Sequence, residues 1–151
     1  MLPRSRIALD HREEGEASIN EALTIARSAP VSDEQALDTF LSAAWSKGSD
    51  WISLRALFEE ALPRARGSGS VEAEIEVRSG LGRALCELGE LGEAEAQINQ
   101  AIALTESIYG ADHPRLALPL SDMGRVLNDL GRTEESIATH RRALAISIAA
   151  F

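Results

Sequence analysis

Residues 82–102 read GRALCELGELGEAEAQINQAI, and residues 124–144, which lie 42 positions later, read GRVLNDLGRTEESIATHRRAL. Both copies share a Gly-Arg pair at the start, a Leu-Gly pair in the middle and an alanine followed by a large aliphatic residue at the end. In each copy a helical apolar period stops at a glycine, and a second helical period follows. A fixed period of this length is typical of stacked helical hairpins, each of which buries its apolar face against its neighbours.

Composition limits what the chain can be and what it can bind. Its 151 residues, 44% of them apolar, suffice for one domain, which we place at 1–151. The net charge of −9 would repel nucleic acid and anionic membranes, so we expect neither as a partner. No apolar run is long enough for a signal peptide or a membrane span, which favours a cytoplasmic protein. Arginine supplies nearly all positive charge, with Lys47 the single lysine, and this usage is typical of GC-rich bacterial genomes.

Three breaks divide the chain at similar intervals, at residues 28–31, 67–69 and 110–114, and shorter glycine turns lie between them. From these breaks and turns we predict seven helices: 10–28, 32–47, 50–66, 71–88, 91–109, 114–130 and 133–150. They group into three hairpin repeats, 32–66, 71–109 and 114–150. The helix at 10–28 is left as a second helix without a first, because residues 1–9 are too short to form a full partner helix.

The second helix of each hairpin carries the same apolar stripe, with spacings of four, three and one residues, as expected for one helix face. Its four copies are Gly15, Ile19, Ala22, Leu23; Leu54, Phe58, Ala61, Leu62; Ala94, Ile98, Ala101, Ile102; and Ser136, His140, Ala143, Leu144. The alanine in the third position predicts close approach of neighbouring helices. Gly82 and Gly124 predict the same on the first helix, and we expect His140 to be a core residue with one polar contact.

The repeat resembles the tetratricopeptide repeat, in particular the 42-residue type of kinesin light chains and many bacterial proteins. Residues 120–136 follow the first helix, glycine turn and Glu-Glu start of that pattern, and Gly110-Ala111-Asp112-His113-Pro114 reproduces its link between repeats. The resemblance implies a right-handed α-α superhelix, a solenoid of antiparallel hairpins with about three and a half repeats. It also implies a concave wall made by the first helices, on which a peptide or protein segment binds.

Arg83 and Arg125 occupy equivalent positions of two first helices, directly after the small glycine, so the resemblance places both on the concave wall. Arginine presents a planar fork that suits carboxylate or phosphate. Alternatively, each arginine is neutralised within its own helix, by Glu87 or Asp129 four residues on. The expected binding face consists of Ser79, Arg83, Glu87, Ser121, Asp122, Arg125, Asn128 and Asp129.

No catalytic, cofactor-binding or metal-binding residues are predicted. The three histidines lack metal-ligand spacing, and Cys86 is the single cysteine, which excludes a disulfide framework and a cysteine metal site. His113 is best interpreted as part of a helix start, where it or Asp112 accepts a hydrogen bond from the next helical turn. No serine, threonine or cysteine has an identifiable base at a meaningful spacing.

Two functional hypotheses follow. The first is a non-catalytic interaction module or scaffold that binds a peptide or partner segment in the concave groove, as a fragment of a larger bacterial signalling or regulatory protein. The second is a self-assembly or intramolecular structural module that uses the ends of the solenoid and has no groove ligand. This alternative includes a homo-oligomer through uncapped terminal helices, because the final helix carries a set of apolar residues that nothing covers: Ile137, Leu144, Ile148 and Phe151.

Overall fold

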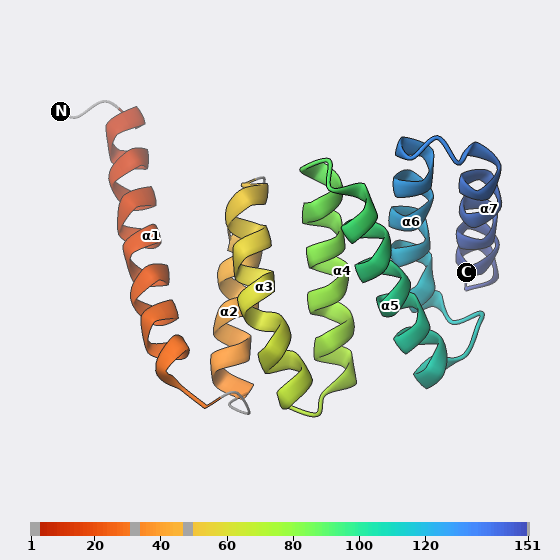
Figure 1. Cartoon of the computed structure of the whole chain (residues 1–151). Coiled ribbons are helices and arrows are strands. Elements are labelled where there is room, and N and C mark those ends of the chain that lie inside the picture. The colour runs from red at the N-terminus through yellow and green to blue at the C-terminus, as the bar shows by residue number, and fades with distance from the viewer. Residues whose placement is uncertain (1–3, 31–33, 47–49, 151) are drawn as a thin grey trace.

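The computed structural model describes residues 4–30, 34–46 and 50–150, and within them the chain forms seven α-helices and one short 3-10 helix (Figure 1). In chain order these are α1 (Arg4–Ser28), α2 (Glu34–Ser46), α3 (Trp51–Gly67), α4 (Val71–Glu87), α5 (Leu91–Tyr109), η1 (Pro114–Leu116), α6 (Ala117–Asp129) and α7 (Thr133–Ala149). The expected all-α solenoid of stacked helical hairpins is confirmed.

The helices form an array in which each packs on its neighbours in sequence, and the two termini lie at opposite ends (Figure 1). Three antiparallel hairpins follow one another: α2 with α3, α4 with α5, and α6 with α7. The first helices α4 and α6 also touch each other, so they form one continuous wall. α1 precedes the first hairpin and packs against α2.

Most predicted helix boundaries agree with the structure to within two residues, and α1 is the exception. It begins at Arg4, not at residue 10. Residues 4–9 contain no glycine or proline, so nothing in the sequence prevents the helix from beginning before residue 10. The predicted starts and ends at 31–33 and 47–49 lie outside the described residues. The start of the sixth helix at Pro114 takes the form of the 3-10 turn η1, which leads directly into α6.

The tight turns inside the hairpins depend on glycine. Gly89 and Gly131 have φ angles of 80° and 79°, a left-handed conformation that costs glycine little. In the first turn the amide of Glu90 donates to the carbonyl of Leu85, a bond that spans the last turn of α4 and closes it. The equivalent bond joins Arg132 to Leu127 after α6. Both turns therefore end the first helix and direct the chain back along it.

The two helices of a hairpin approach most closely at the predicted small residues. A Cβ atom on Gly82 would lie 2.5 Å from Cγ1 of Ile98, and a Cβ atom on Gly124 would lie 2.5 Å from Nε2 of His140. Ile98 is fully buried, as expected. His140 is not the core residue we predicted: it covers Gly124 but remains exposed, because it belongs to the last helix of the array.

Successive second helices are joined by ion pairs at equivalent repeat positions. Arg55 pairs with Glu90, and one repeat later Glu95 pairs with Arg132, with the signs exchanged. A second set of equivalent positions also exchanges signs, but two repeats apart: Arg27 of α1 pairs with Glu60 of α3, and Glu106 of α5 pairs with Arg142 of α7. Exposed pairs of this kind are worth about 0–1 kcal/mol each, so they favour the correct stacking register more than they add stability.

Arg64 fixes the end of α1 on the array. Its guanidinium group is buried and donates hydrogen bonds to the carbonyls of Arg27, Ala29 and Pro30, at distances of 3.1–3.2 Å. It also lies over the ring of Phe40, 5.2 Å from the ring centre. The last carbonyls of a helix have no partner within the helix, so Arg64 satisfies groups that burial would otherwise leave unpaired.

Gly82→Leu should lower the free energy of unfolding by about 1–3 kcal/mol, because the new side chain meets Ile98 at a contact with no free space. Gly92→Leu is the matched control, since a Cβ atom there meets nothing within 4 Å. Chemical denaturation of both variants measures the difference. Equal stability of the two variants would show that the hairpins do not depend on close approach at Gly82.

Arg64→Met should cost about 1–3 kcal/mol of stability, because it removes three hydrogen bonds to carbonyls at the end of α1. The control is Arg66→Met, two residues along the same helix, where the arginine is exposed. Denaturation followed by circular dichroism compares the two. A loss no larger than that of the control would mean that solvent replaces these bonds at no cost.

Candidate functional site

The predicted binding face lies on the wall formed by α4 and α6. Ser79, Arg83 and Glu87 come from α4, and Ser121, Asp122, Arg125, Asn128 and Asp129 come from α6. Contact between these two helices is direct. The structure therefore brings residues about 40 positions apart in the sequence onto one surface.

The two arginines of this face bridge the two helices. Nη2 of Arg83 lies 3.0 Å from Oδ2 of Asp122, and Nη1 of Arg125 lies 2.7 Å from Oε1 of Glu87. Each arginine thus pairs with a carboxylate of the neighbouring first helix, and not with the residue four positions on that we had considered. A ligand carboxylate would have to compete with these pairs, so neither arginine is a free cation.

The other predicted residues surround these bridges. Ser79 and Ser121 are half-buried, whereas Asn128 and Asp129 are exposed near the end of α6. Cys86 is buried beside Arg125. Burial raises the pKa of the Cys86 thiol; Arg125 opposes this change, while Asp129 and Glu87 add to it. The thiol is therefore protonated at neutral pH, which is unsuited to a nucleophile.

An open cleft of about 440 Å³ lies at the other end of the wall, between α4 and the start of α6. It is lined mainly by apolar groups, and Leu118 on its α6 side is 59% exposed. The full lining is Ile75, Glu76, Ser79, Gly80 and Arg83 from α4, with Pro114, Arg115, Ala117, Leu118 and Pro119 from η1 and α6. Of the predicted face, Ser79 and Arg83 reach this cleft.

Our prediction missed the apolar side of the cleft. Ile75 and Leu118 lie outside the core stripe, and a large apolar residue off that stripe is the signal that could have indicated a binding surface. Such residues are common on protein surfaces, so the signal gains meaning only when the fold places the two opposite each other.

The cleft borders the link between the second and third hairpins, which is held by aromatic and cationic contacts. The rings of Tyr109 and His113 stack at 4.6 Å, and the guanidinium group of Arg115 lies 4.8 Å from the Tyr109 ring centre. Nδ1 of His113 accepts a hydrogen bond from the amide of Arg115, which confirms its predicted role at a helix start. Tyr109 also donates to Glu72 on α4.

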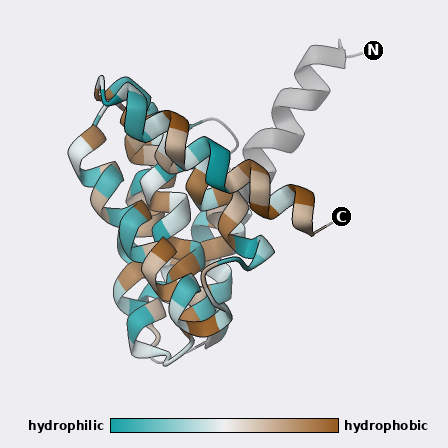
Figure 2. Ribbon diagram, turned by 90° about the vertical axis from the view of Figure 1, so that its right-hand side faces the viewer, coloured by the Kyte–Doolittle hydropathy of each residue, from teal (hydrophilic) through white to brown (hydrophobic). Residues whose placement is uncertain are grey.

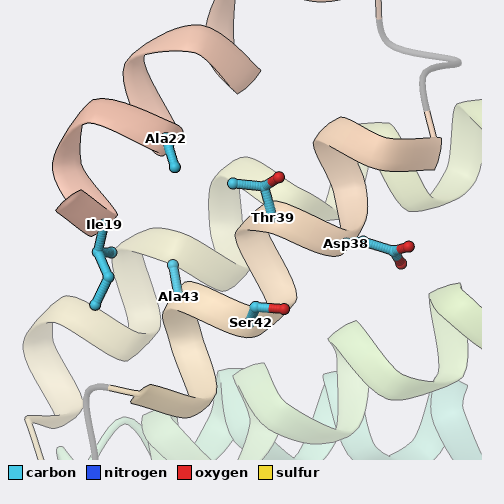
Figure 3. Close-up of a pocket in the computed structure, with 6 residues that line it drawn as sticks. All are labelled: Ile19, Ala22, Asp38, Thr39, Ser42 and Ala43. Carbon is cyan, nitrogen blue, oxygen red and sulfur yellow. The ribbon is translucent and has the colours of Figure 1, made fainter. Parts of the chain in front are cut away.

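A second cleft, of about 290 Å³, lies between α1 and α2 (Figure 3). Ile19 and Ala22 line it from α1, and α2 contributes four residues: Asp38, Thr39, Ser42 and Ala43. Across the residues that the structure describes, no group of three or more histidine, cysteine, aspartate or glutamate side chains is placed to hold a metal ion.

Comparison with curated proteins found no match. Comparison with known protein families matches residues 71–149, a little over half of the chain, to the tetratricopeptide repeat. The matched segment contains α4 to α7, the two hairpins in which we predicted the clearest repeats and whose first helices form the wall. The kinesin-light-chain-like type and a bacterial origin stay predictions from the sequence. The chain belongs to the tetratricopeptide repeat family.

Proposed function

We propose that this protein is a non-catalytic interaction module that binds a peptide or partner segment in the groove between α4 and α6. Tetratricopeptide repeats generally mediate protein–protein interactions. The observation that carries the proposal is the apolar cleft beside the charged wall, because the two together provide an anchoring site and a polar surface along one groove.

The size and lining of the cleft favour an apolar anchor residue in the ligand. A volume of about 440 Å³ accommodates one or two large side chains. Burying one leucine-sized or phenylalanine-sized side chain contributes about 1.5–3 kcal/mol. Glu76 and Arg83 lie on the α4 side of the cleft and can orient the ligand backbone or a polar neighbour of the anchor.

Beyond the cleft, the ligand meets paired charges. The predicted face holds two guanidinium groups, Arg83 and Arg125, and three carboxylates, Glu87, Asp122 and Asp129. Since both arginines already pair with carboxylates of this set, Asp129 adds an exposed negative charge at the α6 end. A ligand that continues along the wall is thus favoured when it carries a basic residue after its apolar anchor.

The alternative function, self-assembly or an intramolecular contact through the ends of the solenoid, is favoured by the composition of α7. Ile137 and Ile148 occupy the repeat positions that carry Glu95 and Glu106 in α5, where both glutamates form ion pairs with the next repeat. Leu144 between them is 60% exposed. Figure 2, which views the array from the α7 end, shows hydrophobic residues recurring along this last helix. An exposed apolar stripe of this kind is typical of an interface.

The remaining expectations concern location and context. No helix in the described part of the chain combines the length and apolar character needed to cross a membrane. A cytoplasmic location, one domain spanning 1–151, and a place within a larger bacterial signalling or regulatory protein stay predictions from the sequence and the resemblance.

Leu118→Glu should abolish capture of peptides from a displayed library, because it places a charge in the apolar cleft. Ile137→Glu is the matched control: it makes the same change at another exposed aliphatic residue, at the end of the array. We expect the control to capture the same peptides as the native chain, as measured by sequencing and by binding titration of the enriched peptides.

The same two variants test the alternative with reversed outcomes. If the solenoid ends assemble, the native chain shows a mass that rises with concentration in sedimentation, Ile137→Glu abolishes this rise, and Leu118→Glu retains it. That result, together with no selective capture by the native chain, would overturn the groove assignment.

Removing both wall arginines should change the charge of the captured peptides. Arg83→Ala with Arg125→Ala leaves Asp122 and Glu87 without their partners, so the wall becomes more negative and the captured sequences should gain lysine and arginine. The control is Arg66→Ala with Arg141→Ala, which removes two exposed arginines outside the wall. An unchanged charge distribution would place the ligand away from these residues.

A further inference from the structure

One face of α1 is exposed, although the equivalent face is covered in the other second helices. The alanine of the stripe is buried in α3, α5 and α7, where Ala61, Ala101 and Ala143 are at most 3% exposed. The equivalent Ala22 of α1 is exposed. In α5 and α7 the first helix of the same hairpin packs on this face, as the contacts of Gly82 and Gly124 show. Among the described residues no such helix packs on α1.

The side of α2 that borders this face of α1 is also uncovered, at positions that are covered in α6. Alignment of the repeats places Thr39 and Ser42 of α2 where α6 has Asp122 and Arg125. In α6 these two residues contact the preceding first helix, α4, through Arg83 and Glu87. In α2 they line the cleft of about 290 Å³ (Figure 3). The cleft thus lies where the first helix of a hairpin would sit, between a second helix and the next first helix.

The walls of this cleft are fixed before anything binds. Leu23 and Ala26 of α1 are buried in the core, Arg64 holds the carbonyls at its end, and Arg27 pairs with Glu60 at 2.7 Å. A preformed groove of this kind binds a partner with little loss of its own conformational entropy.

We propose that the cleft between α1 and α2 is a docking seat for one amphipathic α-helix of a partner protein. The bound helix lies against Ile19 and Ala22 as α4 lies against Ile98 and Ala101. This contact is separate from the groove between α4 and α6. We infer it because the cleft continues the series of positions that the first helices occupy in the other hairpins.

The hairpin of α4 and α5 specifies the chemistry of the bound helix. Ile19 occupies the position of Ile98, and Ile98 tolerates no side chain opposite it, since a Cβ on Gly82 would lie 2.5 Å away. The partner helix therefore carries glycine where it crosses Ile19.

The charge of the seat adds a second requirement. In α4 a cation, Arg83, directly follows the small residue and meets a carboxylate of α6. In the seat Thr39 takes the place of that carboxylate, and the carboxylate of the lining is Asp38, one residue earlier. It extends from α2 on the side away from α1 and forms no ion pair with any described residue (Figure 3). The partner helix accordingly carries lysine or arginine next to its small residue.

The test uses a helix of known sequence as the probe. A fluorescent peptide of residues 71–90, with capped ends, carries the α4 sequence and is titrated against the full chain while anisotropy is recorded. We expect saturable binding that Ala22→Arg weakens by about tenfold or more, because the arginine blocks the seat. Thr39→Arg, on the opposite wall, should have the same effect. Circular dichroism verifies that both variants keep their helix content, as expected for substitutions on the surface of the cleft.

Controls separate the seat from other surfaces. Asn20→Arg makes the same kind of change on α1 at a repeat position that is exposed in all four second helices, so binding should be unchanged. A probe with Gly82→Leu should bind about tenfold more weakly or worse, because the leucine meets Ile19. Leu118→Glu, which blocks the groove between α4 and α6, should leave probe binding intact, so failure of the groove proposal and failure of the seat proposal are distinguishable.

Three results would overturn the proposal. One is no binding of the probe by the native chain, and another is equal binding by Ala22→Arg. The third is a dimer of the native chain that forms without the probe and is lost in Ala22→Arg, because this would assign the seat to a second copy of the chain.

Discussion

The close approach of two helices within each hairpin is the constraint on which the structure depends. Gly82 and Gly124 allow the backbone of a first helix to lie directly against Ile98 and His140 of its second helix. That contact sets how far each helix is rotated about its axis, and rotation decides which side chains reach the neighbouring repeat. The bridges of Arg83 and Arg125 to Asp122 and Glu87, and the apolar cleft beside them, follow from this register. The glycine turns at Gly89 and Gly131 only have to return the chain along the helix it has just left.

Sequence alone predicted the features that depend on local spacing. The helices, the glycine turns and the stripe as it is buried in α5 were accessible, because period and punctuation express one hairpin at a time. The residues of the α4–α6 wall followed from the resemblance to the tetratricopeptide repeat. The partners of Arg83 and Arg125 could not be predicted in this way. They depend on how far α4 is shifted along α6, which local sequence spacing does not determine. The cleft between Ile75 and Leu118 was missed for the same reason. The extension of α1 to Arg4 was missed because nothing breaks the helix there, and His140 because the last helix has no further repeat packed over it in the described chain.

The charges and the apolar positions divide the surface into distinct parts. Inside the array, Arg55 pairs with Glu90 and the equivalent Glu95 pairs with Arg132, and this exchange of signs from one repeat to the next disfavours a stack that slips by one repeat. On α7 the same positions are Ile137 and Ile148, and on α1 the alanine of the stripe is uncovered. The ends thus differ chemically from the interior, and the groove between α4 and α6 differs from both. The fold therefore offers three separate surfaces: the groove between α4 and α6, the exposed apolar stripe of α7, and the cleft between α1 and α2.

Amide hydrogen exchange of the full chain, with and without a peptide recovered by library capture, tests the central claim most directly. That claim is that partners bind the groove between α4 and α6. Residues 114–119 form the 3-10 turn and first turn of α6. Pro114 and Pro119 have no amide proton, so residues 115–118 report exchange here, and the amides of Arg115, Leu116 and Ala117 bond only within the same short turn. Our account predicts that the peptide slows exchange in this segment and leaves α7 unchanged. New protection confined to α7, with residues 114–119 exchanging as before, would contradict it.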